Sequence, residues 1–178
     1  MFIRTPPSRQ SGLDQLFNQL IRPRLRPLIA DCYKDVSYVL DEEGYGEAEY
    51  QDVIRKRFIR SWNNLVEPYK ETFTTANYQF IFSLTISVLS RLWETQLKSM
   101  KFTELGALRF DRDLRSITSF LSNQTAFGVS VIRDSFSRLQ QIAMLLSVET
   151  VSASRPLLQS RIELTPASPC YRLVMQTI

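Results

Sequence analysis

The stretch from Lys101 to Glu149 constrains the fold most strongly, because its apolar residues recur at helical spacing in two successive blocks separated by a short polar break. The apolar positions are Phe110, Leu114, Ile117 and Leu121 in the first block, and Ile132, Phe136, Leu139, Ala143 and Leu146 in the second. The charged residues of the first block are Arg109, Asp111, Arg112, Asp113 and Arg115. Two amphipathic helices are therefore predicted, with apolar stripes toward a core and, in the first helix, mixed charge toward water.

Glycine is rare, with five residues in a chain of 178. Long segments therefore run without a turn signal, which favours helices over the many short strands of a sandwich or barrel. Apolar residues make up 44% of the chain and charged residues 22%, an ordinary balance for a globular protein. The predicted fold class is all-α, either one core-forming domain or a rod of stacked helices.

The first part of the chain predicts helical structure interrupted by proline. A helical pattern begins near Gly12 and resumes at Leu28. Pro23 and Pro27 lie between these points, and a proline inside a helix lacks the amide hydrogen and clashes with the preceding turn. A kinked helix and two consecutive helices both satisfy this pattern.

The next part predicts a loop followed by a long helix. Residues 41–50 are acidic and contain two glycines, which predicts a surface loop leading into a helix with Glu47 and Glu49 in its first turn. The apolar stripe of that helix comprises Val53, Ile54, Phe58, Trp62, Leu65 and Tyr69. Pro68 predicts that the helix ends near Glu67.

Residues 73–100 carry an ambiguous pattern. Apolar residues from Phe80 to Val88 alternate with small polar residues as in a strand, but Ile81, Leu84 and Val88 also have helical spacing. We favour a helix, because no turn signal bounds a strand-length piece and the helical pattern continues beyond it.

Glycines and tryptophans add further expectations. Gly106 is expected where two helices meet, and Gly128 is expected to close one helix before Ser130 caps the next. Trp62 and Trp93 lie on helical stripes and are expected in the core.

The pattern divides the chain into three parts. Residues 1–11 are polar and are expected to be a disordered end. Residues 12–149 are expected to form the helical bundle. Residues 150–178 contain prolines and no helical period, which predicts a poorly ordered tail.

Several classes of function lose support from composition. Histidine is absent, and with it the commonest general base and metal ligand. Cys32 and Cys170 have no C-x-x-C spacing, so neither a zinc site nor a redox motif is indicated. The longest uncharged run, Thr72 to Ser90, is rich in serine and threonine and is interpreted as a buried helix. We predict no enzyme activity, no cofactor and no metal site.

The sharpest basic cluster is formed by Arg22, Arg24 and Arg26, which two prolines are expected to hold on a semi-rigid, exposed segment. Guanidinium groups can clamp phosphates or acidic side chains through paired hydrogen bonds. The simpler interpretation, which we favour, is a connection between helices whose arginines face solvent, because charge clusters are often merely solvated.

A second basic cluster comprises Arg55, Lys56, Arg57 and Arg60. Such residues more often pair with carboxylates one turn away, for which Glu47, Glu49 and Asp52 are available.

Asp111 and Asp113 do not make an acid–base pair, because residues two apart on a helix do not share a face. Surface ion pairing is the role predicted for both aspartates.

Three segments together resemble a known family: LGALRFDRDLRS, followed by IRDSFSRLQQIA and by LLSVE. They are similar to the C-terminal region of subunit 4 of the conserved oligomeric Golgi complex. The resemblance covers Lys101 to Glu149 and extends back to about Leu13. It implies an elongated bundle of stacked helices, of the kind found in multisubunit tethering complexes, and a role in assembly.

The resemblance also implies a vesicle-tethering subunit of intra-Golgi retrograde transport on the cytosolic face of the Golgi. The implied partners are the other subunits and, through regions expected to lie outside this chain, SNARE proteins and their regulators. The alternative is a basic helical module that binds anionic membrane or nucleic acid through the two arginine clusters. Salt dependence separates them, because phosphate-driven binding weakens steeply as salt rises.

Arg138, in the segment FSRL, is implied by the resemblance to be a buried structural residue held by an acidic partner just after an L-T-P-A element. Here Leu164 to Ala167 is followed by Ser168, which is no carboxylate. A buried arginine without its partner costs several kcal/mol.

The chain then ends in SPCYRLVMQTI, where the family pattern implies another helix or two. A natural short isoform and a gene model that reads into an intron both explain this. We favour the second, because lost helices would leave apolar faces uncovered. Sequencing the transcript across these codons tests it, and finding this ending in the dominant message would refute it.

Overall fold

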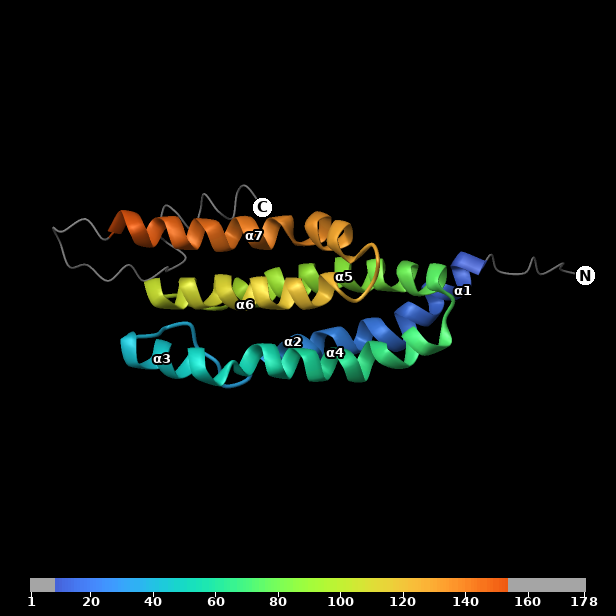
Figure 1. The fold of residues 1–178 in the computed structure, drawn as a ribbon, viewed down its shortest axis with the longest axis horizontal. Helices are drawn as coiled ribbons and strands as arrows, with labels where there is room; N and C mark the ends of the chain where they lie inside the picture. Colours follow the sequence, from blue (N-terminus) through green and yellow to red (C-terminus); the bar gives the residue numbers. More distant parts are fainter. Residues whose placement is uncertain (1–8, 154–178) are drawn as a thin grey trace, which may run out of the picture.

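A computed structural model describes the backbone of residues 9–153 and the side chains of residues 11–147. These residues form an elongated bundle with helices close to its long axis (Figure 1). The helices are α1 (Arg9–Leu16), the π-helical turn η1 (Phe17–Ile21), α2 (Arg22–Cys32), α3 (Glu42–Gln51), α4 (Val53–Thr72), α5 (Thr75–Leu97), α6 (Glu104–Ser122) and α7 (Gly128–Ala153). The predicted all-α class is confirmed. The predicted tail lies mostly outside the described residues.

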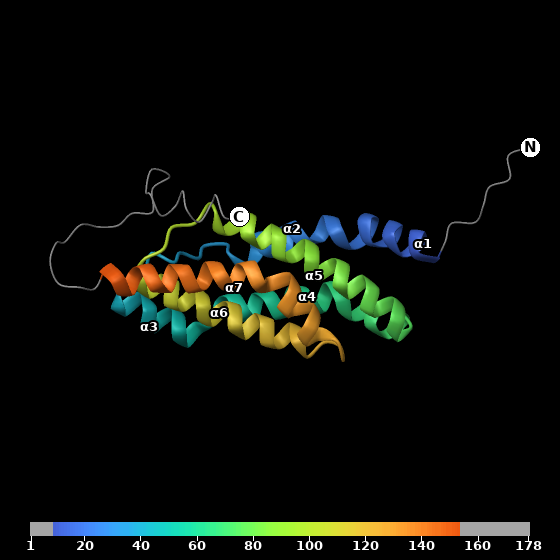
Figure 2. The ribbon, with the colours of Figure 1, turned by 90° about the horizontal axis from the view of Figure 1, so that it is seen from above.

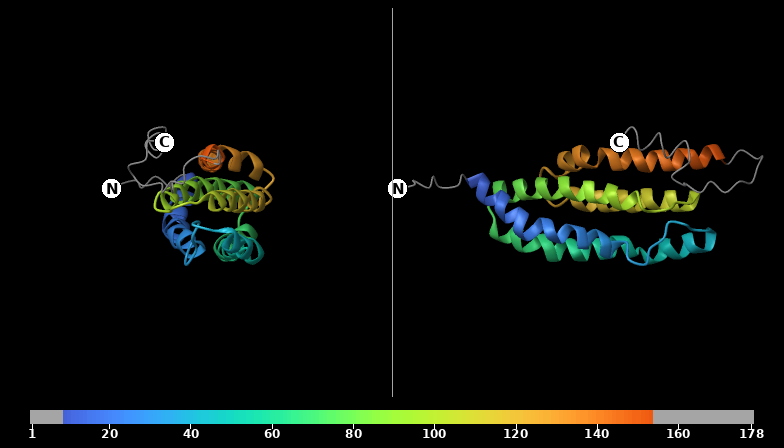
Figure 3. Two further views of the ribbon diagram at one scale, coloured as in Figure 1. Left: turned by 90° about the vertical axis from the view of Figure 1, so that its left-hand side faces the viewer. Right: turned by 180° about the vertical axis from the view of Figure 1, so that it is seen from behind.

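The helices stack in layers, as the view along the bundle shows (Figure 3, left). Helix α7 lies on one side, α5 and α6 lie in the middle, and α2 and α4 lie on the other side. Helix α2 packs on α4 and α5, while α6 packs on α3, α4 and α7. Seen from above, α1 and α2 run end to end along one edge (Figure 2). The pair α2 and α4 is therefore an outer layer.

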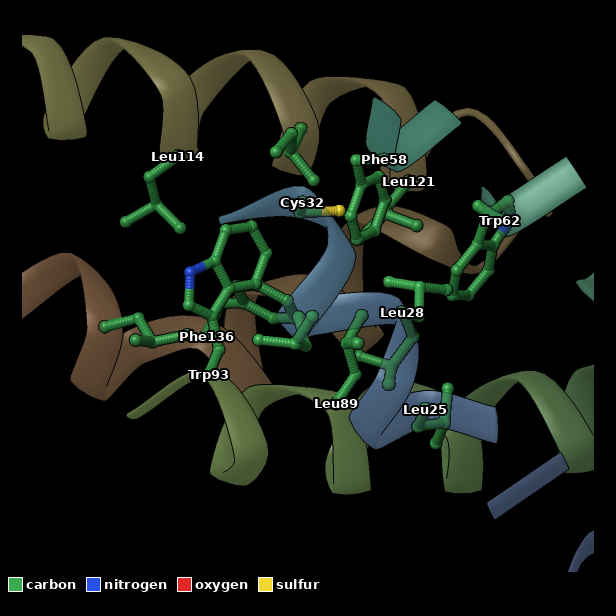
Figure 4. Close-up of a cluster of buried hydrophobic side chains, with 14 of the residues drawn as sticks. Leu25, Leu28, Cys32, Phe58, Trp62, Leu89, Trp93, Leu114, Leu121 and Phe136 are labelled. Atoms are coloured by element: carbon green, nitrogen blue, oxygen red, sulfur yellow. The ribbon is translucent and has the colours of Figure 1, made fainter. Parts of the chain in front are cut away.

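Aromatic side chains join these layers in the core (Figure 4). The ring of Trp93 stacks on Phe58 of α4, with ring centroids 5.8 Å apart, and meets Phe136 of α7 edge-on at 5.9 Å. Phe58 also stacks on Trp62 at 5.9 Å. Both tryptophans are only 1% exposed, so their predicted place in the core is confirmed. Large buried aromatic groups supply much of the free energy that holds such a bundle together.

The prolines of α2 do not break the helical path. The π-helical turn η1 lies directly before Pro23, and the amide of Arg22 donates to the carbonyl of Phe17. Pro23 lies in the first turn of α2, where a missing amide hydrogen costs little. Pro27 lies inside α2, so the carbonyl of Pro23 loses its helical donor. The path from α1 through η1 to α2 is therefore one continuous helix with a π-helical turn, and not two separate helices.

Two boundary predictions in the middle of the chain are wrong. Residues 42–51 form helix α3 and not a loop, because the Asp41 carboxylate caps the helix by accepting a hydrogen bond from the Gly44 amide at 2.8 Å. Glu47 and Glu49 therefore lie in α3, before the helix that they were expected to begin. Helix α4 continues past Pro68 to Thr72, since Pro68 is exposed and water can reach the carbonyl that it leaves unpaired.

The last helices begin and end differently from the prediction. The long helix predicted within residues 73–100 is confirmed as α5. Helix α6 ends at Ser122, and Gly128 begins α7 instead of closing α6. A Cβ atom at Gly128 would lie 2.2 Å from the carbonyl oxygen of Ser122, so this glycine permits a tight turn. Ser130 lies within α7, and its hydroxyl donates to the carbonyl of Phe127.

The start of α6 is pressed against the extended segment of residues 36–40. Thr103 caps α6 and its amide donates to the carbonyl of Tyr38 at 3.0 Å. The amide of Leu40 donates to the Thr103 hydroxyl at 2.9 Å. A Cβ atom at Gly106 would lie 1.6 Å from the Tyr38 carbonyl oxygen, so only glycine allows this approach.

Candidate interaction surfaces

Arg22, Arg24 and Arg26 lie on α2 and all three are exposed. They are not on a connection between helices, as the simpler interpretation expected, because α2 accommodates both prolines. The Nη1 atom of Arg22 donates to the Asn18 side-chain oxygen at 3.1 Å. Within the described residues none of the three forms an ion pair with a carboxylate. All three guanidinium groups are therefore open to solvent.

The residues of the second basic cluster differ in whether they have a partner within the chain. Arg55 pairs with Asp52 at 3.5 Å, and the Lys56 ammonium donates to the carbonyl of Gln51 at 2.7 Å. Arg57 is half-buried and donates to the carbonyl of Lys34. Arg60 is exposed, and in residues 9–153 no carboxylate pairs with it. Of the two candidate site residues in this cluster, Arg57 thus has a backbone partner, and Arg60 has no ionic partner in the described part of the chain.

A shallow groove of about 230 Å³ runs between α2 and α4. Arg24 and Pro27 line it from α2, and Ser61 and Asn64 line it from α4. Arg60 lies one turn before Asn64 on the same face of α4, beside the groove. The structure therefore brings Arg24 and Arg60, from two separate sequence clusters, to one surface.

A buried ionic network on α6 was missed by the sequence analysis. Arg109 and Asp113 were expected to face water, but they are 4% and 1% exposed. The Arg109 Nε atom lies 3.0 Å from the Asp113 Oδ1 atom, and its Nη2 atom lies 3.4 Å from Asp52 Oδ1. The Tyr38 hydroxyl donates to Asp113 Oδ2 at 3.0 Å. The network ties α6 to the junction of α3 and α4 and to the segment after α2.

Asp52 provides the turn that makes this network possible. Its backbone has φ 46° and ψ 44°, the left-handed region that aspartate tolerates better than most residues. The turn separates α3 from α4 and directs the Asp52 carboxylate toward Arg109 and Arg55. A backbone conformation that is itself unfavourable is thus held by two ion pairs.

Burial raises the pKa of the Asp113 carboxyl above its ordinary value of 3.8. The Arg109 guanidinium and the Tyr38 hydroxyl oppose this change, and the nearby charge of Asp52 adds to it. Asp113 Oδ1 and Arg109 Nη1 have no aligned hydrogen-bond partner among the described residues. Because Asp113 is enclosed by its partners while Asp111 pairs with Arg115 at 2.7 Å on the surface, the two aspartates share no catalytic site.

The other chemical groups in the described part of the chain do not indicate a reactive centre. Burial raises the pKa of the Cys32 thiol to about 12, which keeps the thiol protonated at neutral pH. Cys170 lies outside the described residues. Among residues 9–153, no cluster of three or more histidine, cysteine or acidic side chains is arranged to hold a metal ion. None of the described helices is long and apolar enough to cross a membrane.

Comparison with known proteins identifies the family. A family model for the C-terminal part of conserved oligomeric Golgi complex subunit 4 matches residues 4–165. The chain belongs to this family. The subunit 4 of Arabidopsis thaliana is 33% identical over 142 residues, which are 80% of this chain and 19% of that relative. The Bos taurus and Homo sapiens subunits are 31% and 30% identical over 143 residues, which are 80% of this chain and 18% of each relative. The chain therefore spans less than a fifth of the length of these subunit 4 relatives.

The expectation that Arg138 is a buried residue needs correction. Its side chain is 45% exposed and not buried, and its Nε atom lies 3.9 Å from the Glu94 Oε1 atom of α5. The L-T-P-A element and Ser168 lie outside the described residues. The proposed cost of a buried arginine without a partner does not apply to this geometry.

Proposed function

We propose that this chain is the C-terminal helical region of a vesicle-tethering subunit that acts in intra-Golgi retrograde transport. It would work without catalysis, as a peripheral component on the cytosolic face of the Golgi membrane. The partners proposed for this region are other subunits of the conserved oligomeric Golgi complex. For the whole subunit we also propose contacts with SNARE proteins and their regulators.

The family match over residues 4–165 carries this proposal. The relatives that support it are all named as subunit 4 of the conserved oligomeric Golgi complex. A subunit of a multiprotein assembly needs a rigid shape that holds its surfaces in fixed positions. The aromatic core that joins α4, α5 and α7 supports such a role.

The buried polar groups support a structural role over a catalytic one. Arg109, Asp113 and Tyr38 are enclosed and interact with one another. A pocket of about 320 Å³ is lined in part by these three residues, but their polar groups are already occupied by one another. Their arrangement serves to fix helices relative to one another.

Affinity purification of the tagged chain from gently lysed cells, in moderate salt, tests the proposal. Mass spectrometry should recover other subunits of the Golgi complex at near-equal abundance. The matched control is the Phe110→Asp variant, which places a charge at a fully buried position of α6 and should unfold the bundle. Recovery of the same subunits by both proteins would show capture by an unfolded chain and would contradict the proposal, as would their absence from both.

A further inference from the structure

The outer layer formed by α2 and α4 carries arginines that the fold does not neutralise. These are Arg22, Arg24 and Arg26 of α2 and Arg60 of α4, which together we name the basic face. All four are exposed, and no carboxylate within the described residues forms an ion pair with them. Elsewhere in the bundle, Arg109, Arg112 and Arg115 each have a carboxylate partner. Asp31 of α2 is exposed and lines the same groove as Arg24, but it forms no ion pair with the four arginines, so the basic face carries a net positive charge.

The shape of the basic face suits an extended surface. Helices α2 and α4 lie side by side along the bundle and form its outer layer, opposite α7 (Figures 1 and 3). Arg24 and Arg60 lie beside the groove between the two helices, while Arg22 and Arg26 lie one turn apart on α2. Arg24 is two residues from both Arg22 and Arg26, so it lies on the other flank of α2 from them. A flat anionic surface laid over the groove could meet Arg24 and Arg60 together, with Arg22 and Arg26 at its edge.

The same layer lacks the features of a strong protein interface. Such interfaces have an apolar centre, commonly with exposed aromatic anchors. The large exposed apolar residues of the described chain are Leu20, Val39, Tyr50, Leu108, Phe127, Val129, Met144 and Leu145, and none of them is in α2 or α4. The contact that this face can make is electrostatic, and it does not require insertion of apolar groups.

We propose that the basic face binds an anionic membrane through the phosphate groups of its lipids. Arginine suits this partner, because its planar guanidinium forms paired hydrogen bonds with phosphate oxygens. The proposal deepens the proposed function by naming the surface that meets the membrane, and it rests on that function for its cellular setting. Each arginine near an anionic surface strengthens binding about fivefold, so the contact is weak alone and gains strength in a multisubunit assembly.

Cosedimentation of the purified 178-residue chain with lipid vesicles tests the proposal. The probes are vesicles of phosphatidylcholine alone and of phosphatidylcholine mixed with phosphatidylserine. We expect binding only to the mixed vesicles and a steep loss as ionic strength rises to about 0.15 M. The Arg24→Gln/Arg60→Gln variant should bind about 25-fold more weakly, whereas Arg22→Gln/Arg26→Gln, on the other flank of α2, should lose less.

The matched control is Arg115→Gln/Arg133→Gln, which removes the same charge from α6 in the middle layer and from α7 in the opposite outer layer. It should bind within about twofold of the unmodified chain, because neither arginine belongs to the basic face and salt screens charges that do not approach the membrane closely. Glutamine is a good helix former, and circular dichroism would confirm that each variant is folded. An equal loss in the control would show an effect of net charge alone and would overturn the assignment of the face.

Two further results with vesicles and RNA would also overturn the proposal: equal binding to neutral vesicles, and binding to short RNA at least as tight as to the mixed vesicles. A third would be that the Arg24→Gln/Arg60→Gln variant no longer copurifies with a protein that the unmodified chain retains, while its vesicle binding is unchanged. The last would make the layer a protein interface. This test is separate from that of the proposed function. Failure to bind vesicles while the other Golgi subunits still copurify would refute only the membrane face, whereas vesicle binding without those subunits would refute only the tethering role.

Discussion

Helices α6 and α2 each carry three arginines close together, but the fold uses them differently. In α6, Arg109 pairs with Asp113 and Asp52. Arg112 pairs with Glu49, and Arg115 pairs with Asp111. In α2 the arginines are Arg22, Arg24 and Arg26, which have no carboxylate partner in the described part of the chain. Arg109 and Arg112 therefore connect α6 to neighbouring elements, whereas the arginines of α2 remain available.

The cause of the difference is the position of each helix in the bundle. Helix α6 is in the middle and packs on α3, α4 and α7, so Glu49 of α3 and Asp52 of the following turn reach its arginines. Helix α2 is in the outer layer, and one side of it faces solvent. Burial makes a charge expensive unless it is paired, whereas an exposed charge needs no partner. Charges that fix the fold and charges that can bind a partner are thus separated by layer.

The largest expected effect comes from breaking the buried network of α6. Replacing Arg109 with methionine keeps an apolar stem of similar length but leaves Asp113 buried without its cation. We expect a loss of about 3–5 kcal/mol in the free energy of unfolding, measured by urea denaturation.

The control for this change is Arg115→Met, because Arg115 pairs with Asp111 at the same i, i+4 spacing on the same helix but is 78% exposed. Its expected cost is about 0–1 kcal/mol. The double variant Arg109→Met/Asp113→Leu should recover much of the loss, since it removes both buried charges. If both single variants cost the same, burial is not what distinguishes the two pairs.

Close backbone packing should give the next largest effect. Gly106→Ala forces a Cβ atom against the Tyr38 carbonyl, where the ideal position is only 1.6 Å from the oxygen. We expect thermal unfolding to show a loss of about 1–3 kcal/mol, because α6 must shift away from residues 36–40. Gly46→Ala is the matched change, since nothing lies within 4 Å of its Cβ position in α3. That variant should gain about 0.5–1 kcal/mol, and a loss there would mean that the effect at Gly106 is not caused by the contact.

The pH dependence of stability provides a smaller effect with a defined sign. Burial raises the pKa of Asp113 above 3.8, so the folded chain holds this proton more tightly than the unfolded chain. The resulting stabilisation is present below pH 3.8 and is lost as the pH rises through the raised pKa. An asparagine side chain cannot ionise, so the Asp113→Asn variant should become more stable relative to the unmodified chain across that interval. Each pKa unit corresponds to about 1.4 kcal/mol.

Urea denaturation of both proteins, repeated from acidic to neutral pH, measures this difference. Because both chains carry the same other carboxyl groups, subtracting one profile from the other isolates the contribution of the Asp113 carboxyl. A difference that changes in the opposite direction would mean that the pairing with Arg109 and Tyr38 outweighs burial.

The long periodic helices could be predicted from the sequence because their cores are apolar on one face. The stripe of α6, with Phe110, Leu114, Ile117 and Leu121, is buried as expected, and so are most apolar positions of α7. Helix α3 could not be recognised by periodicity, since it has no buried residue and depends on the Asp41 cap and on packing against α6. The continuation of α4 past Pro68 likewise depends on local exposure, which the sequence does not report.

The buried network left a signal that the sequence analysis overlooked. Asp113 lies three residues after Phe110 and four before Ile117, which places it within the apolar stripe, and Arg109 precedes it by one turn. The prediction considered Asp113 only together with Asp111, two positions away, and so missed that Asp113 lies in the apolar stripe one turn after Arg109. The partners Asp52 and Tyr38 could not be found in this way, because the bundle brings them from distant parts of the chain.

The smallest expected change in stability belongs to the arginines of α2. Replacing Arg22, Arg24 and Arg26 together with glutamine should alter the free energy of unfolding by no more than about 0.5 kcal/mol, because the three groups are exposed and have no ionic partner to lose in the described part of the chain. Thermal and urea denaturation would both test this. The same triple variant should nevertheless lose nearly all binding to phosphatidylserine vesicles. A large loss of stability would show that these arginines hold the fold as Arg109 does, and the separation of charges by layer would then fail.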